Sequence, residues 1–370
     1  MWGRALAVES WPRLRRLHAV KPLADLRVLA VIPGNGAGAS MIFTRRQIDS
    51  LARLGVDVCT MYLNSRMSLV GLWQEWLRLR REIRNYRPQI VHAHYGTVTA
   101  FLCAIATTRP LVVTFRGSDL NSNPEIGFLR ARLSFLLSQI AARRATQVIC
   151  VSRQLQSRLW SSRRERALVV PDGVDLDLFR PLPKLQARAR LGWEADVPII
   201  LFNTSEQPRA KGIDLVKAAI KVAEQRVPRL DLAILDGTVP PHEVPLYLSA
   251  ADCVALASFR EGSPNIVKEA LACNVPVVSV DVGDVAERLA GVYPSRIVER
   301  DPVEFGNALA DIVAAGLRSN GREVVTTCSE KSVAERIRGV YDWIIHGQNG
   351  TACDVSTHAG VSNTEYSSHA

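Results

Sequence analysis

The sequence of 370 residues lacks any run of about 18 or more apolar residues, so we expect no membrane-spanning helix. It also lacks a Cys-x-x-Cys pair, and its seven cysteines are scattered, several of them within apolar runs. We therefore expect reduced core thiols rather than a disulfide framework. The first 25 residues contain arginines but no apolar stretch or cleavage site of a signal peptide, which predicts a cytoplasmic protein.

Zinc-finger, homeodomain and RNP-type patterns are absent too, although the formal net charge is +10. Residues 1–180 hold 27 Lys/Arg and 12 Asp/Glu, a net charge of +15, whereas residues 181–370 hold 19 and 24, a net of −5. A basic half beside an acidic half suggests that the basic half faces something anionic. We therefore expect no nucleic-acid partner and take an anionic membrane surface as the candidate.

Short apolar runs alternate with amphipathic segments along both halves of the chain, which favours parallel sheets covered by helices. The predicted strands are 27–32, 56–63, 90–92, 111–115, 147–151 and 167–170 in the first half, and 198–203, 231–235, 253–257 and 275–280 in the second. A proline-bearing break at 179–183 is the predicted domain boundary.

The fold class that follows is α/β, with two Rossmann-like domains over residues 26–180 and 184–331 whose parallel sheets face each other across a cleft. Residues 332–346 are predicted to form a helix that packs back toward the first domain. Residues 1–25 are a basic extension, and residues 347–370, rich in Ser, Thr and Gly, are predicted to be a disordered tail.

Two carboxylates, Glu261 and Glu269, stand eight residues apart in the segment SFREGSPNIVKEALA, residues 258–272. Ser263 followed by Pro264 predicts a helix start, because Ser caps free N–H groups and proline suits the first helical position. Glu261 is then in a loop and Glu269 in the helix. In an α/β protein such a loop lies at the carboxyl edge of the sheet, where ligands bind. The helix N-terminus also offers N–H groups to an anion.

This segment resembles the E-x7-E signature of the family 4, or group 1, glycosyltransferases, which are retaining enzymes of the GT-B fold. The resemblance covers roughly residues 27 to 345. It implies that Glu261 contacts the transferred sugar and that Glu269 hydrogen-bonds the ribose of a nucleotide-sugar donor. The donor-binding residues that it implies at the helix start are Ser263, Pro264, Asn265, Ile266 and Val267.

Two cations, Arg209 and Lys211, lie just before a helix predicted over residues 212–225. Cations at a helix N-terminus oppose its dipole unless an anion is bound there. A donor diphosphate would be that anion, and the alternative is a pair of solvated surface cations. The family has an Arg and a Lys-Gly here, which Lys211 and Gly212 match. Residues 203–208 replace the Gly-Arg that the family has after the strand, a departure that weakens the assignment of Arg209.

A glycine loop follows the first strand, where Gly34, Gly36 and Ala39 fit the dinucleotide pattern G-x-G-x-x-A. A nicotinamide cofactor would need an acidic residue at the end of the second strand, but Asp57 begins that strand. The resemblance implies instead that this loop faces the donor phosphates and the acceptor. Gly36 and Gly38 would permit that close approach.

After the strand 111–115, the family commonly has a histidine near the reacting sugar where this chain has Arg116. We expect Arg116 to hold an acidic group of the acceptor or donor instead. Asp119 would bind sugar hydroxyls or, equally well, cap the turn. His92 and His94 resemble a metal pair, but no third ligand is evident, so no metal and no cofactor are predicted.

Residues 72–84 carry Trp73, Trp76 and several arginines at helical spacing, which suits either a membrane interface or an ordinary packed helix with a basic face.

Taken with the resemblance, these features predict a cytoplasmic retaining hexosyltransferase, peripheral on the inner face of the plasma membrane. It would move a sugar from a nucleotide-diphosphate-sugar donor to a saccharide or lipid-linked acceptor in envelope or exopolysaccharide synthesis. The alternatives are a nucleotide-sugar epimerase of the same fold and a non-catalytic nucleotide-sugar-binding protein.

Overall fold

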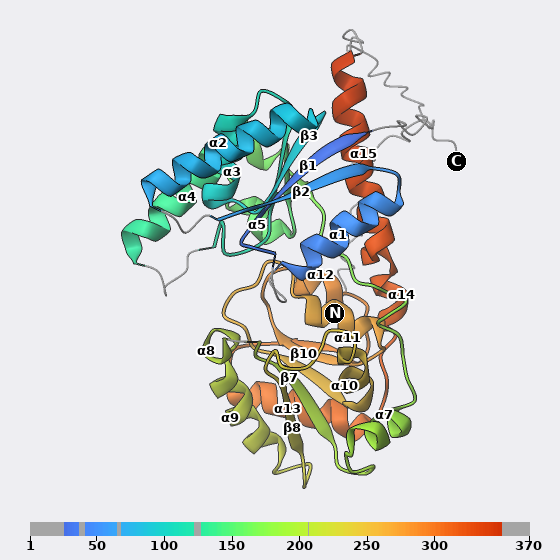
Figure 1. Ribbon diagram of the computed structural model, residues 1–370. Helices are drawn as coiled ribbons and strands as arrows, with labels where there is room; N and C mark the ends of the chain where they lie inside the picture. The colour runs from blue at the N-terminus through green and yellow to red at the C-terminus, as the bar shows by residue number, and fades with distance from the viewer. Residues whose placement is uncertain (1–25, 37–40, 65–67, 122–126, 206, 350–370) are drawn as a thin grey trace, which may run out of the picture.

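The computed structural model describes residues 26–36, 41–64, 68–121, 127–205 and 207–349. Within these residues the chain forms two α/β domains, one above the other in Figure 1, each built on a parallel sheet. The predicted extension at 1–25 and most of the predicted tail lie outside the described residues. Among the described residues, none of the helices has the combination of length and hydropathy that a membrane-spanning segment needs.

The N-terminal domain has a six-stranded parallel sheet in the order β2-β1-β3-β4-β5-β6. Its strands are β1 (Arg27–Pro33), β2 (Asp57–Leu63), β3 (Ile90–His94), β4 (Leu111–Phe115), β5 (Gln147–Cys150) and β6 (Leu168–Val169). Its helices are α1 (Ile42–Arg53), α2 (Leu69–Tyr86), α3 (Thr97–Ala106), α4 (Phe128–Arg144), α5 (Arg153–Ser157) and α6 (Ser161–Arg164).

Both faces of this sheet are buried, which explains why strands such as β1 and β4 are predominantly apolar rather than alternating between polar and apolar residues. Side chains alternate along each strand, so Val91 and Val113 pack in the core beneath α2, α3 and α4. Their neighbours Ile90 and Val112 pack on the opposite face, against α1 and the C-terminal helix. The functional loops must therefore leave the sheet at its edges.

The C-terminal domain has a five-stranded parallel sheet in the order β11-β10-β9-β7-β8. Its strands are β7 (Ile199–Asn203), β8 (Asp231–Leu235), β9 (Cys253–Leu256), β10 (Val277–Val280) and β11 (Arg296–Val298). The helices from α7 on are α7 (Lys184–Leu191), α8 (Pro208–Lys211), α9 (Ile213–Ala223), α10 (Val244–Ala250), α11 (Asn265–Ala272), α12 (Val285–Leu289), α13 (Pro302–Ala315), α14 (Gly321–Val325), the 3-10 turn η1 (Thr326–Cys328) and α15 (Glu330–Asn349).

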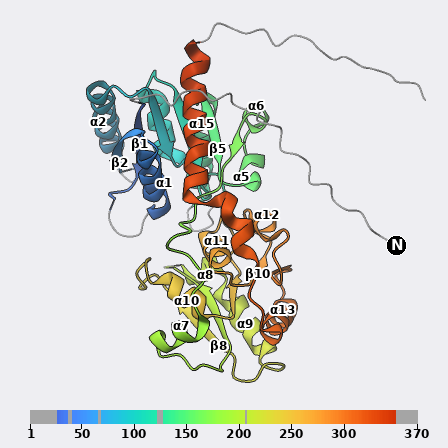
Figure 2. The same cartoon turned by 90° about the vertical axis from the view of Figure 1, so that its right-hand side faces the viewer.

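Helix α15 returns to the N-terminal domain, as Figure 2 shows. Its residues Val333, Ile337 and Tyr341 are buried in the core on the α1 face of the first sheet. The two chain segments that cross between the domains are hydrogen-bonded to each other, because the Val174 amide donates to the Cys328 carbonyl at 2.9 Å. The domains are thus joined by a paired double connection and by the packing of α15.

The structure differs from the predicted elements in two places of the C-terminal domain. Strand β11 was not predicted, because only Val298 of its three residues is buried and the apolar signal is correspondingly weak. Arg209 and Lys211 lie in a short helix of their own, α8, rather than in a loop. The six cysteines of the described residues are all free, and five of them are buried.

Candidate functional site

A cavity of about 260 Å³ lies between the two domains, where loops that follow the parallel strands of both sheets meet. The N-terminal domain contributes the loop after β4, and the C-terminal domain contributes α8 with the loop after β9. This is the position that ligands occupy in α/β folds. The lining residues are Arg116, Gly117, Ser118, Asn121, Gln207, Ala210, Lys211, Arg260, Glu261 and Gly262.

The domains touch at glycines beside this cavity. A Cβ added to Gly262 would lie 1.9 Å from the Arg116 carbonyl oxygen of the other domain. The Asn121 side-chain amide donates to the Glu261 carbonyl across the same boundary at 3.3 Å. The backbone loops that carry Arg116 and Glu261 are therefore in direct contact in this structure.

The predicted residues Lys211 and Glu261 form an ion pair in the cavity, with 2.6 Å between Lys211 Nζ and Glu261 Oε1. Helix α8 positions the lysine, because the Phe259 amide donates to the Ala210 carbonyl at 3.1 Å. Gly212, with φ of +80°, lets the chain turn from α8 into α9, and a Cβ there would lie 2.1 Å from the Ala257 carbonyl oxygen. A side chain at residue 212 would therefore collide with the backbone after β9, which explains why a glycine follows Lys211.

The two arginines near this ion pair are placed differently. Arg209 is exposed on α8 and is not among the residues that line the cavity. Arg260, which the sequence reasoning did not single out, does line it, as do Asn121 and Gln207. In the sequence, the signal that could have identified Arg260 as a site residue is its position directly before Glu261.

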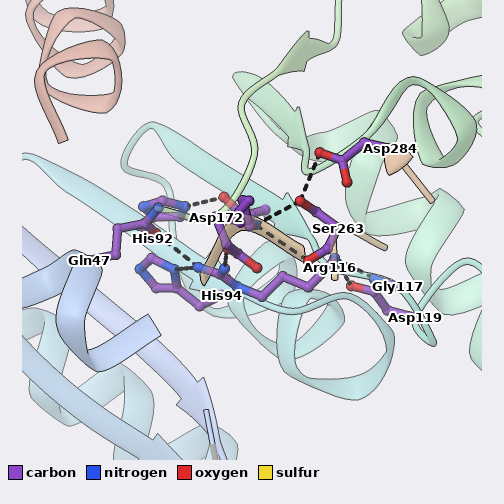
Figure 3. Close-up of polar contacts among 11 residues, drawn as sticks. Gln47, His92, His94, Arg116, Gly117, Asp119, Asp172, Ser263 and Asp284 are labelled. Atoms are coloured by element: carbon purple, nitrogen blue, oxygen red, sulfur yellow. Dashed lines mark hydrogen bonds and ion pairs between the residues drawn. The ribbon is translucent and has the colours of Figure 1, made fainter. Parts of the chain in front are cut away.

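The start of α11 corrects the predicted cap. The helix begins at Asn265, Pro264 occupies the N-cap position, and Ser263 makes no capping hydrogen bond. The Ser263 hydroxyl instead donates to Asp284 Oδ2 at 2.9 Å and accepts from Lys268 Nζ at 2.8 Å (Figure 3 shows the first of these). A buried carboxylate and ammonium compete for the hydroxyl, which leaves the first N–H groups of α11 without that side-chain partner.

Two further predicted donor-binding residues, Ile266 and Val267, direct their side chains into the core of the C-terminal domain. Only their backbone groups are therefore available to a ligand at the helix N-terminus. Glu269, one turn further, is partly exposed. Desolvation raises the pKa of Glu269 to about 7, opposed by the positive charges of Arg46 on α1 and of Lys268.

Arg116 is buried and points into the N-terminal domain rather than standing free in the cleft (Figure 3). Its guanidinium pairs with Asp172, in the segment that links the domains, and donates to Gln47 Oε1 at 2.9 Å. A ring nitrogen of His94 lies 3.2 Å away. The acidic group that Arg116 holds in this structure is therefore one of the protein's own carboxylates.

His92 and His94 stack with their ring centroids 3.8 Å apart. His92 also contacts the Tyr341 hydroxyl at 2.6 Å and the Thr114 hydroxyl at 2.8 Å. Burial, followed by the charge of Arg116, lowers the pKa of His92 to about 3, so the ring is neutral at pH 7. Among the described residues no group of three or more His, Cys, Asp or Glu side chains could hold a metal ion.

Asp119 is buried beside Arg116 and organises the loop after β4. Its carboxylate accepts hydrogen bonds from the backbone N–H groups of Gly96, Arg116 and Gly117 at 2.9, 3.0 and 2.8 Å. Desolvation raises the pKa of Asp119, while these backbone bonds oppose the shift. The geometry favours the turn-capping alternative over contact with sugar hydroxyls.

The glycine loop after β1 is described only as far as Gly36, so Gly38 lies outside the described residues. Gly36 has a φ of +79°, and a Cβ there would lie 2.7 Å from the Tyr62 ring. Asp57 stands at the start of β2, as expected. A tyrosine, rather than a carboxylate, thus lies beside the glycine loop, which disfavours a nicotinamide dinucleotide.

Comparison with known families assigns both domains. Residues 39–178 match the profile of Glycosyltransferase Family 4, and residues 219–315 match that of Glycosyl transferases group 1. TuaC of Bacillus subtilis, named for a glycosyltransferase role in teichuronic acid biosynthesis, is 30% identical over 55% of this chain and 56% of its own length. A D-inositol 3-phosphate glycosyltransferase of Thermobispora bispora is 28% identical over 47% and 48%. The chain spans about half the length of these curated relatives.

Solved structures share the fold over most of the chain. Sucrose-phosphate synthase from Thermosynechococcus elongatus superposes with a TM-score of 0.69 at 19% identity, covering 87% of this chain and all of the other. Anabaena HepE in complex with UDP gives 0.67 at 18%, covering 85% and 99%. A UDP-GlcNAc 2-epimerase from Methanocaldococcus jannaschii gives 0.54 at 11%, covering 86% and 99%. With both profiles matched and the fold shared, the chain belongs to the family 4, or group 1, glycosyltransferases of the GT-B fold.

Proposed function

We propose that this protein is a retaining hexosyltransferase that uses a nucleotide-diphosphate-sugar donor. The observation that carries the proposal is the Lys211–Glu261 ion pair in the cavity between the domains, just before the N-terminus of α11. A cation, a carboxylate and a helix N-terminus at one point suit a diphosphate joined to a sugar. The glycosyltransferase names of the relatives and the UDP complex of HepE support the same donor class.

Binding of the diphosphate would break the Lys211–Glu261 ion pair and give each side chain a new partner. Lys211 would turn from Glu261 to the phosphate oxygens, which frees the carboxylate to accept hydrogen bonds from sugar hydroxyls. Negative charge on the diphosphate grows as the bond from the anomeric carbon to oxygen breaks. That charge is larger in the transition state than in the bound donor, so its stabilisation there lowers the barrier. The stabilising groups would be Lys211, an arginine (Arg209 or Arg260) and the N–H groups of α11.

Glu269 would hold the ribose of the donor. With its pKa raised to about 7, the carboxyl group changes charge in the neutral range, and the positive charge of Arg46 favours the ionised form. Two ribose hydroxyls would donate to the ionised carboxylate, which restores part of the hydration that it lost. The contact between the loops at Gly262 and Arg116 would exclude water from the donor and limit its hydrolysis.

We further propose that the acceptor is a saccharide presented at a cell membrane, lipid-linked or polymeric, and that the protein meets it from the cytoplasmic side. The teichuronic acid role in the name of TuaC and the basic first half of the chain support this proposal. The turn-capping geometry of Asp119 and the pairing of Arg116 with Asp172 support a role for these two residues in shaping the acceptor-side loop.

A nucleotide-sugar epimerase is the second candidate, because UDP-GlcNAc 2-epimerases share the fold. The two functions differ in what the donor becomes. A transferase needs an acceptor to consume the donor and releases a nucleoside diphosphate, whereas an epimerase converts the donor alone to an isomeric nucleotide sugar, with no net release of nucleoside diphosphate.

The experiment begins with thermal-shift screening of nucleoside diphosphates and their sugars, since a specific ligand raises the melting temperature by mass action. The best donor is then incubated with and without oligosaccharide and lipid-linked acceptors, and products are resolved by mass spectrometry. Acceptor-dependent release of nucleoside diphosphate is expected. Conversion of the donor to an isomer without acceptor would support the epimerase, and a thermal shift without any turnover would indicate a binding protein.

A further inference from the structure

The N-terminal half of α4 has no buried residue. Of its apolar side chains, Phe128 is 68% exposed, Leu129 82%, Leu133 55% and Leu136 44%. The first buried residue of the helix is Ser138, after which α4 packs normally. Five of the nineteen most exposed large apolar side chains of the described chain thus belong to this one helix, Phe135 included.

The N-terminal half of α2 shows the same property. Leu69 is 86% exposed, Val70 67% and Trp73 58%, and only Gly71 and Leu79 of the whole helix are buried. Trp73 stacks on Trp76 with ring centroids 4.7 Å apart, and Trp76 packs against the core behind it. Trp73 is therefore the tryptophan that faces outward.

These two helix ends lie at one edge of the domain. Helices α2 and α4 both pack against α3 on the same face of the sheet, and both are drawn on the left of Figure 1. Each begins after a parallel strand, α2 after β2 and α4 after β4, so both N-termini lie at the carboxyl edge of the sheet. That edge also carries the loop of Arg116 and Asn121 that lines the cavity.

The charge around these apolar side chains has one sign on α4, whose sequence contains four arginines and no acidic residue. Arg132 lies over the Phe128 ring at 4.6 Å, which places a guanidinium beside an exposed aromatic side chain. On α2, the acidic Glu75 is paired with Arg78 at 2.7 Å, and Arg80 lies over the Trp76 ring at 4.9 Å.

We propose that this α2/α4 face, defined by the exposed apolar side chains of residues 69–77 and 128–136 with their neighbouring arginines, docks on an anionic lipid surface. Apolar side chains beside cations suit the boundary between lipid headgroups and acyl chains. A second copy of the chain would set arginines against arginines, which opposes a symmetric dimer through this face. Docking here would hold the cavity edge toward the membrane. The inference deepens the acceptor side of the proposed function, but lipid binding needs no turnover and is tested separately.

The test measures co-sedimentation of the full chain with vesicles of phosphatidylcholine containing increasing phosphatidylglycerol, at low and high salt. Two variants remove the apolar contribution, Phe128→Ser with Leu129→Ser on α4, and Trp73→Ser on α2. A third, Arg130→Gln with Arg132→Gln, removes the charge. We expect each to lower affinity for anionic vesicles, the double variants by about tenfold or more, and high salt to weaken binding of the unaltered chain.

The matched control changes an equally exposed apolar side chain and an exposed arginine of the other domain, Leu185→Ser with Arg190→Gln on α7, where Leu185 is 64% exposed. It should bind vesicles like the unaltered chain, and all variants should keep their melting temperature. Equal binding of the unaltered chain to neutral and anionic vesicles would overturn the proposal. So would a concentration-dependent dimer that the α4 variant abolishes, because the face would then meet a second copy.

Discussion

The two domains share a parallel, helix-covered sheet, yet they use their helices differently. In the C-terminal domain, α9 buries five of its eleven residues, whereas α4 of the N-terminal domain buries four of seventeen, all in its second half. The first 180 residues carry a net charge of +15 and the remainder a net of −5. The basic residues of the first part are arginines with the exception of Lys21, and guanidinium groups are less strongly hydrated than ammonium groups.

This difference indicates a division of work between domains of one architecture. Lys211, Glu261 and Glu269 belong to the C-terminal domain, where the donor would bind. The N-terminal domain contributes a tightly hydrogen-bonded wall around Arg116 and an outer face with unpartnered apolar side chains. Substitutions confined to one domain test this division of work.

The largest effect is expected from Gly212→Ala, which tests whether the turn between α8 and α9 holds the C-terminal chemistry. The positive φ alone costs about 1–2 kcal/mol, and the added Cβ would collide with the Ala257 carbonyl, adding about 1–3 kcal/mol. Gly192→Ala is the control, since Gly192 has a φ of +69° with open space around it. Chemical denaturation should show the larger loss for Gly212→Ala, with transfer abolished. Equal losses would mean that the loop after β9 moves aside freely.

Lys211→Ala should lower the transfer rate constant kcat by roughly 10²–10³, because the lysine would meet charge that grows in the transition state. Lys217→Ala, an exposed lysine on the next helix, should leave it unchanged. Steady-state kinetics over a range of donor concentrations measures kcat and the KM for the donor separately. A raised KM with kcat intact would make Lys211 an anchor of the ground state only.

Glu269→Gln should weaken donor binding by roughly 10- to 150-fold, the loss of a charge-assisted hydrogen bond of about 1.5–3 kcal/mol. The pH dependence follows from the raised pKa. The charged form is penalised in the folded protein, so the variant should gain stability relative to the parent as pH rises from about 4.5 to 7, and the two should differ little below that range. Calorimetric titration with the donor measures the loss of affinity, and denaturation at a series of pH values measures the difference in stability. Unchanged affinity in a folded variant would remove Glu269 from the donor site.

The sequence predicted well what depends on local pattern and poorly what depends on partners distant along the chain. Buried strands such as β4 and the loop and helix positions of Glu261 and Glu269 follow from apolar runs and breakers, and the structure has them where expected. The cap at Ser263 was wrong, because Asp284, 21 residues on, takes the hydroxyl. Likewise no local signal pairs Arg116 with Asp172, which comes from the segment between the domains.

The smallest expected difference separates two arginines that are candidates for the donor diphosphate. Arg209 was selected because it precedes Lys211, whereas Arg260 lines the cavity beside Glu261. We expect Arg260→Ala to weaken binding of the nucleoside diphosphate by roughly tenfold and Arg209→Ala by less than about threefold, since a charge-assisted hydrogen bond is worth about 1.5 kcal/mol or more and an exposed cation much less. Isothermal titration with the diphosphate, at low and high salt, measures both. A larger loss for Arg209→Ala would show that α8 turns its exposed face to the donor when the nucleotide binds.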